Sequence, residues 1–78
     1  MPDLEQEQAH LALADQHIAA GEMRVADQGR LVAHLIEQGC DATAAKDLLR
    51  LLEATLVNWH GHRQMILEAI ARHSPSVP

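Results

Sequence analysis

Apolar residues recur every seven positions along the first half of the chain. That repeat predicts a helix whose apolar stripe packs against another helix. Its members are Leu4, Leu11, Ile18, Val25 and Val32. The companion positions of the same stripe are mostly small or polar, namely Glu7, Ala14, Gly21, Gln28 and Leu35. We therefore expect the partner helix to approach closely near the middle of this stripe.

The second half carries a similar stripe at alternating spacings of four and three, which predicts a second helix. Its members are Ala45, Leu49, Leu52, Leu56, Trp59, Arg63, Ile66, Ile70 and His73. Gly39 suits the left-handed position that ends a helix, and Asp41 is a good cap for the next one. The sequence thus predicts an all-α, coiled-coil-like antiparallel hairpin. Its helices cover about 3–38 and 43–73, its turn covers 39–42, and 74–78 form a disordered tail.

The expected register follows from a turn centred near Cys40. Trp59 then lies opposite Gly21, Leu56 near Val25, and Ile66 near Ala14. A glycine inside a helix costs about 1 kcal/mol relative to alanine, so a kink at Gly21 or Gly61 is left open. The predicted core and interaction residues are Leu11, Ile18, Gly21, Val25, Val32, Leu49, Leu52, Leu56, Trp59, Ile66 and Ile70.

Further apolar residues flank the two stripes, so the apolar surface is wider than a two-helix contact covers. They are Leu13, Leu31, Ile36, Leu48, Leu51 and Leu67. A 78-residue hairpin also buries little surface by itself. We therefore expect a C2 homodimer that forms a four-helix bundle. The alternatives are a monomer that captures a different helical protein and a higher oligomer.

Composition supports one all-helical domain over 1–78, because the 47% hydrophobic content is mostly Ala and Leu, with no Phe or Tyr. The net charge is −5, and residues 1–23 hold five acidic residues and no Lys or Arg. This excess disfavours nucleic acid and membrane surfaces as partners. No apolar run approaches the roughly 20 residues of a membrane span. A single cysteine and the lack of a secretion leader lead us to expect a cytoplasmic protein.

Six histidines suggest a metal site, but their spacing disfavours one. Only His17 and His62 are expected to approach each other across the hairpin, with Asp15 or Glu22 as a third ligand. Ordinary surface or half-buried histidines are the favoured interpretation, so we expect no metal or cofactor. The lone thiol of Cys40 is expected to be an exposed, passive group of the turn, with cross-linking or redox sensing as the alternative.

Two polar residues fall within the stripes. Arg63 is expected either to reach out to water or to pair with Glu22 or Asp15. Gln28 is a candidate for fixing the register.

The chain has no glycine-rich phosphate loop, nucleophile elbow, CxxC or HExxH motif, so we expect no enzyme. The favoured function is a small protein-interaction or regulatory module that acts as a helical dimer. One alternative is an RNA- or DNA-binding four-helix dimer, which requires Arg24, Arg30, Lys46, Arg50 and Arg72 to share a face. The other is a metal- or redox-responsive switch built on His17, His62 and Cys40.

Three stretches resemble short, mainly proteobacterial helical-hairpin proteins with no established activity. The first is the run from His17 to Gln28, HIAAGEMRVADQ. The second is Gly39-Cys40-Asp41-Ala42 with Ala45 and Leu48-Leu49, where Ala42 replaces the usual Thr, and the third is His62-Arg63 with Ile66-Leu67. The likeness covers about residues 10–70, and it implies a small mobile or stress-associated accessory protein.

Overall fold

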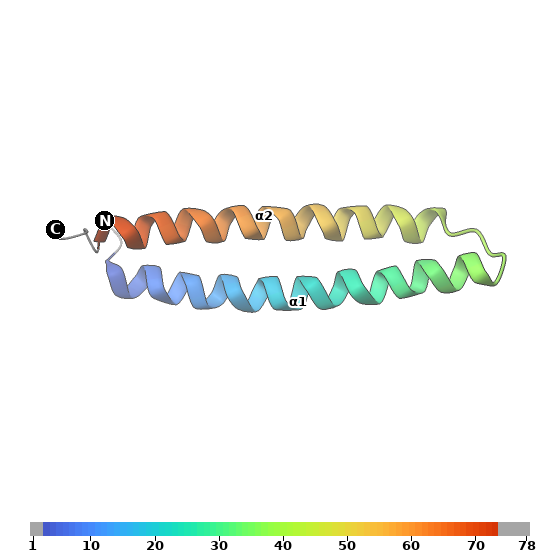
Figure 1. Cartoon of the computed structure of the whole chain (residues 1–78), viewed down its shortest axis with the longest axis horizontal. Coiled ribbons are helices and arrows are strands. Elements are labelled where there is room, and N and C mark those ends of the chain that lie inside the picture. The colour runs from blue at the N-terminus through green and yellow to red at the C-terminus, as the bar shows by residue number, and fades with distance from the viewer. Residues whose placement is uncertain (1–2, 74–78) are drawn as a thin grey trace.

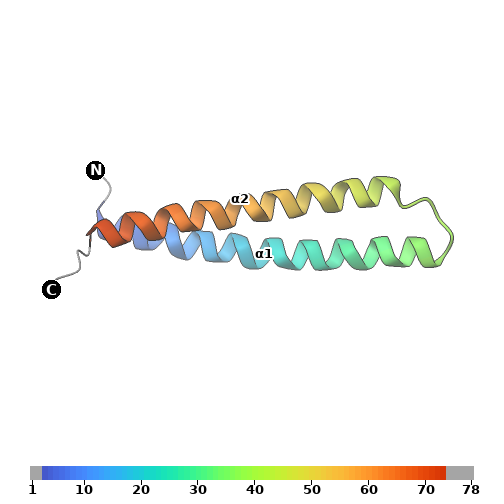
Figure 2. The ribbon, with the colours of Figure 1, turned by 45° about the horizontal axis from the view of Figure 1, so that its top comes forward.

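The computed structural model describes residues 3–73 and contains two antiparallel helices joined by a short turn (Figure 1). Helix α1 covers Leu4–Glu37 and helix α2 covers Thr43–His73. They run side by side in both long views (Figures 1 and 2). The predicted all-α hairpin is therefore confirmed. The expected tail at 74–78 lies outside the described residues.

Helix α1 begins and ends with complete caps. The Asp3 carboxylate accepts a hydrogen bond of 2.8 Å from the backbone N–H of Gln6. At the other end Gly39 takes a left-handed φ of 71°. The Gly39 N–H donates to the carbonyl of Ile36 (3.0 Å), and the Cys40 N–H donates to the carbonyl of Leu35 (2.8 Å). This pair of bonds is a Schellman motif, which stops α1 and reverses the chain.

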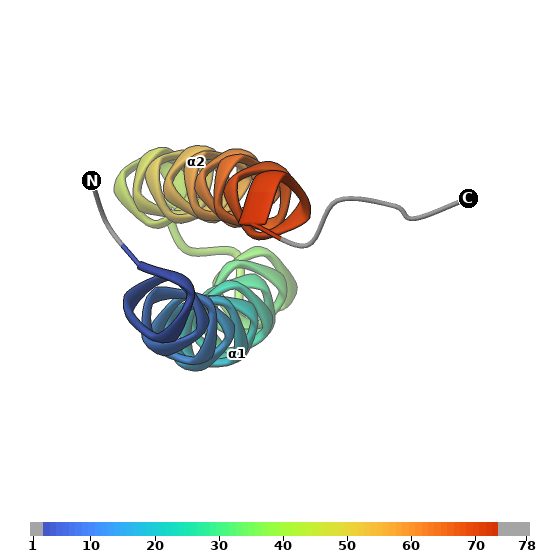
Figure 3. The same ribbon diagram turned by 90° about the vertical axis from the view of Figure 1, so that its left-hand side faces the viewer.

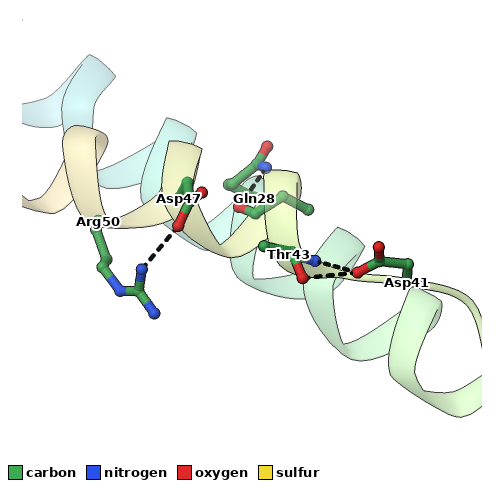
Figure 4. A network of polar contacts seen from close by, with 6 residues as sticks. Gln28, Asp41, Thr43, Asp47 and Arg50 are labelled. Atoms are coloured by element: carbon green, nitrogen blue, oxygen red, sulfur yellow. Dashed lines mark hydrogen bonds and ion pairs between the residues drawn. The ribbon is translucent and has the colours of Figure 1, made fainter.

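The polar side chains of the turn organise the start of α2 (Figure 4). Oδ1 of Asp41 accepts from both the backbone N–H (2.9 Å) and the hydroxyl (2.7 Å) of Thr43. These two bonds, the hydroxyl bond foremost, lower the pKa of Asp41. The first backbone bond of α2 runs from the Lys46 N–H to the carbonyl of Ala42, so Ala42 rather than Asp41 occupies the N-cap.

The contact between the helices, hereafter the seam, is built from the two stripes. Its buried members are Glu7, Ala14, Ile18 and Ile66, and Ala42 of the turn is buried as well. The half-buried members are Leu4, Leu11, Gly21, Val25, Gln28, Val32, Leu35, Ala45, Leu49, Leu52, Leu56, Trp59, Arg63 and Ile70. His73, expected at the end of the second stripe, is exposed because the seam ends before it. Both helices continue without a break through Gly21 and Gly61.

The register differs from the expected one. A Cβ added to Gly21 would meet Leu56 Cδ1 at 3.2 Å, and Leu56 is its only neighbour within 4 Å outside α1 among the described residues. Trp59, expected there, stacks instead on His17. The cause lies in the turn, because Cys40–Ala42 lie outside both helices and the connection runs back along the end of α1 before α2 begins (Figure 1). A residue outside a helix can advance up to about twice as far as a helical one, so α2 is displaced away from the tip.

Two polar contacts cross the seam. Gln28 Nε2 donates to the carbonyl of Ala45 at 3.0 Å, so this half-buried amide ties α1 to the first turn of α2 (Figure 4). Arg63 Nε donates to Asp15 Oδ1 at 2.6 Å. Of the two carboxylates expected for Arg63, the structure selects Asp15.

Candidate functional site

A second row of residues lies beside the seam on α2, and we name it the outer row. Its members alternate at spacings of four and three, as the seam does, and they occupy an arc of about 100° on the helix. The outer row comprises Ala44, Leu48, Leu51, Thr55, Asn58, His62, Met65 and Ala69. All of these are exposed except Ala69, which is half-buried.

The chemistry of the outer row sets it apart from the rest of α2. Leu48, Leu51 and Met65 are 47%, 65% and 67% exposed, respectively, although each is a large apolar side chain. Between residues 44 and 69 the row contains no Asp, Glu, Lys or Arg, whereas other faces of α2 carry six such residues in the same span. Seen end-on, each helix has only the other as a neighbour within residues 3–73, so nothing in the described chain covers this row (Figure 3).

An aromatic cluster adjoins the middle of the outer row. The His17 and Trp59 rings are stacked, with centroids 4.2 Å apart and planes 11° from parallel. His62 meets the indole edge-on, with centroids 5.6 Å apart and planes at 73°. Contacts of this kind are each worth about 0.5–1.5 kcal/mol beyond the area they bury. The cluster therefore holds Trp59 in one orientation at the border between seam and outer row.

A shallow hollow of about 320 Å³ opens on the same side of α2. Its lining residues are Thr55, Asn58, Trp59 and His62. Three of these four belong to the outer row, and the fourth is Trp59 of the seam. The hollow is therefore a recess within the outer row, with an indole wall and polar edges, and its size suits one or two inserted side chains.

The residues considered for a switch do not form a metal site in the described chain. His17 and His62 both contact the indole, and within residues 3–73 no group of three His, Cys, Asp or Glu side chains is close enough to hold a metal ion. Cys40 is a free, exposed thiol whose sulfur lies 3.9 Å from the carbonyl oxygen of Gln38. Its position in the turn is far from both histidines.

The cations needed for a nucleic-acid surface do not gather on one face. Arg30 pairs with Asp27, and Arg50 pairs with Asp47 at 2.7 Å, in each case one helical turn away. By the helical period, Arg24 lies on the side of the hairpin that carries His17, whereas Lys46 lies on the side that carries Asp15. The structure thus offers no observation that favours the nucleic-acid hypothesis.

Sequence reasoning found Leu48 and Leu51 beside the seam but did not recognise the complete row. It missed Thr55, Asn58 and Met65, because polar residues in the centre hide the alternation when only apolar residues are counted. The detectable signal was the absence of charge along one face of α2.

The chain matches no protein-family model, no curated protein and no solved structure in the comparisons made. The resemblance to short proteobacterial hairpin proteins therefore stays a prediction. Neither helix in residues 3–73 is long and apolar enough to cross a membrane.

Proposed function

We propose that this protein is a small helical interaction module that works as a homodimer, with two hairpins joined through their outer rows into a four-helix bundle. The observation that carries the proposal is the uncharged, largely apolar outer row on a helix whose other faces are charged. An exposed apolar row bordered by polar residues is typical of a protein–protein contact. The cytoplasm is the proposed location, as expected from the single cysteine.

The weakness of the seam also supports self-association. The only buried apolar side chains among residues 3–73 are Ala14, Ile18, Ala42 and Ile66, and no large side chain there is fully buried. A chain of this size rarely gains more than about 3–5 kcal/mol from a single core, so a second apolar contact adds needed stability. Covering Leu48, Leu51 and Met65 removes each of them from water and favours the dimer by the hydrophobic effect.

The test compares two substitutions on the same helix. Leu51→Glu places a charge in the outer row, whereas Val57→Glu places the same charge on another face, at a residue of almost equal exposure (65% against 68%). We expect Leu51→Glu to raise the dimer dissociation constant by roughly 30-fold or more, because an unpaired charge would have to be buried. Val57→Glu should leave the constant nearly unchanged.

The measurement is molar mass by light scattering after gel filtration over a hundredfold range of concentration, with reductant present. Trp59 is the only tryptophan, so its fluorescence follows association independently. Wild-type protein that stays monomeric throughout would overturn the proposal and make capture of another helical protein the hypothesis to test. Equal effects of the two substitutions would place the contact elsewhere on the hairpin.

A further inference from the structure

The outer row has a symmetry that bears on how two copies meet. When its members are matched from the two ends toward the middle, Ala44 corresponds to Ala69 and Leu48 corresponds to Met65. The next pairs are Leu51 with His62 and, at the centre, Thr55 with Asn58. Small residues thus stand at both ends, long apolar ones in the second pair, a leucine and a histidine in the third, and short polar ones at the centre.

Such a pattern is what a two-fold contact requires. In an isologous interface, if residue i of one copy contacts residue j of the other, then residue j of the first copy contacts residue i of the second. The surface must therefore be complementary to the same surface turned through 180°. The Thr55 hydroxyl donates to the carbonyl of Leu51 at 3.0 Å, so across the axis it can accept a hydrogen bond from the Asn58 amide. Leu48 of each copy then lies against Met65 of the other, so this apolar contact occurs twice, once on each side of the axis.

We propose that two copies pair their α2 helices antiparallel along the outer row, about a two-fold axis between Thr55 and Asn58, and that Leu51 of each copy fills the hollow beside Trp59 and His62 of the other. This arrangement deepens the homodimer advanced as the proposed function and rests on it. The hollow supports this pairing, because His62, which lines one end of it, is the residue that the reversed pairing places opposite Leu51. Leu51 of one copy covers the indole of Trp59 in the other, while Thr55 and Asn58 at the polar edges pair across the axis.

The arrangement makes a geometric demand that cysteine cross-linking tests. With the axis at the stated position, residue 48 of one copy lies beside residue 65 of the other, while the two copies of residue 48 are about 25 Å apart along the helices. A disulfide needs Cα atoms within about 7 Å. Cross-links are therefore expected between different positions and not between identical ones.

The experiment uses the full chain with Cys40→Ser, so that each variant holds one cysteine. Leu48→Cys carrying an affinity tag is mixed with untagged Met65→Cys, allowed to exchange subunits, and oxidised. We expect the mixed cross-link to exceed the Leu48→Cys homodimer cross-link at least about tenfold, with little linkage of Val57→Cys as the matched control. Leu51→Cys mixed with His62→Cys repeats the test if either first variant loses its helical circular dichroism.

The outcomes separate the two proposals. A dominant Leu48→Cys homodimer cross-link, or equally strong linkage of Val57→Cys, would overturn the antiparallel arrangement while leaving a dimer in place. A wild-type chain that never exceeds monomer mass would overturn the homodimer as well. Oxidised wild-type protein serves as a further check, because the two Cys40 thiols would lie about 50 Å apart and should not link the copies.

Discussion

The seam residues of α2 and the outer row are two rows on the same helix with the same alternating spacing, yet the first row is covered by α1 and the second is exposed. The seam faces α1 and includes Ile66, which is 4% exposed, whereas the adjacent outer-row residue Met65 is 67% exposed. Spacing therefore shows that a row is suited to pack, but it does not show whether the partner belongs to the same chain. The difference also separates two free energies, that of folding the hairpin and that of joining two hairpins.

The largest expected effect comes from shortening a seam residue. Ile66→Ala should lower the free energy of unfolding by about 2–4 kcal/mol, because it removes buried methyl groups and leaves a cavity. Met65→Ala is the matched control and should change hairpin stability by less than about 0.5 kcal/mol at concentrations where the chain is monomeric. Urea denaturation followed by circular dichroism measures both. Similar losses in the two variants would mean that seam and outer row are not distinct.

A smaller effect is expected at the glycines of α1. Gly21→Leu should cost about 1–3 kcal/mol, because even a Cβ there already lies 3.2 Å from Leu56 Cδ1 and a longer side chain overpacks the seam. Gly29→Ala is the contrast. No atom outside α1 among the described residues lies within 4 Å of a Cβ at Gly29, so the gain of roughly 1 kcal/mol in helix propensity should appear undiminished. Thermal unfolding of both variants checks the opposite signs.

The smallest expected effect concerns the turn that sets where both rows of α2 begin. Asp41→Asn should lower the melting temperature at neutral pH, because the carboxylate accepts two hydrogen bonds from Thr43 and its pKa is lowered in the fold. A lowered pKa gives stability that is complete above the ordinary value of 3.8 and is lost as the pH falls through the lowered value. The melting-temperature gap between wild type and variant should therefore close in acid. A gap that stays constant down to about pH 2 would contradict this account.

Local sequence patterns were enough to predict the helical class, the turn and the residues of the two seam stripes. Gly39 is needed at φ 71°, and the heptad positions identify the faces that meet. The placement of Trp59 opposite Gly21 was predicted wrongly, because the register depends on how far the non-helical residues Cys40–Ala42 carry the chain, which spacing within helices does not encode. The stacking of His17 on Trp59 follows from that register and was missed with it.

Spacing along the helices limited the expected partner of Arg63 to Glu22 or Asp15. The positions of the side chains in the structure show that the partner is Asp15. The outer row was partly visible, through Leu48 and Leu51, but its polar centre at Thr55 and Asn58 lacked the apolar signature. What covers the outer row depends on a second molecule, which the sequence of one chain does not identify. The homodimer is therefore a proposal.

The Schellman turn at Gly39 also has a consequence for the order of folding. In a hairpin the sequence separation of facing residues grows steadily with distance from the turn, so each new contact adds only a small increment of loop-closure entropy once the previous one has formed. We expect folding to begin where Gln28 meets Ala45 and to proceed toward Asp15 and Arg63 as a zipper. Substitutions near the turn should then slow folding, whereas those at the far end should mainly speed unfolding.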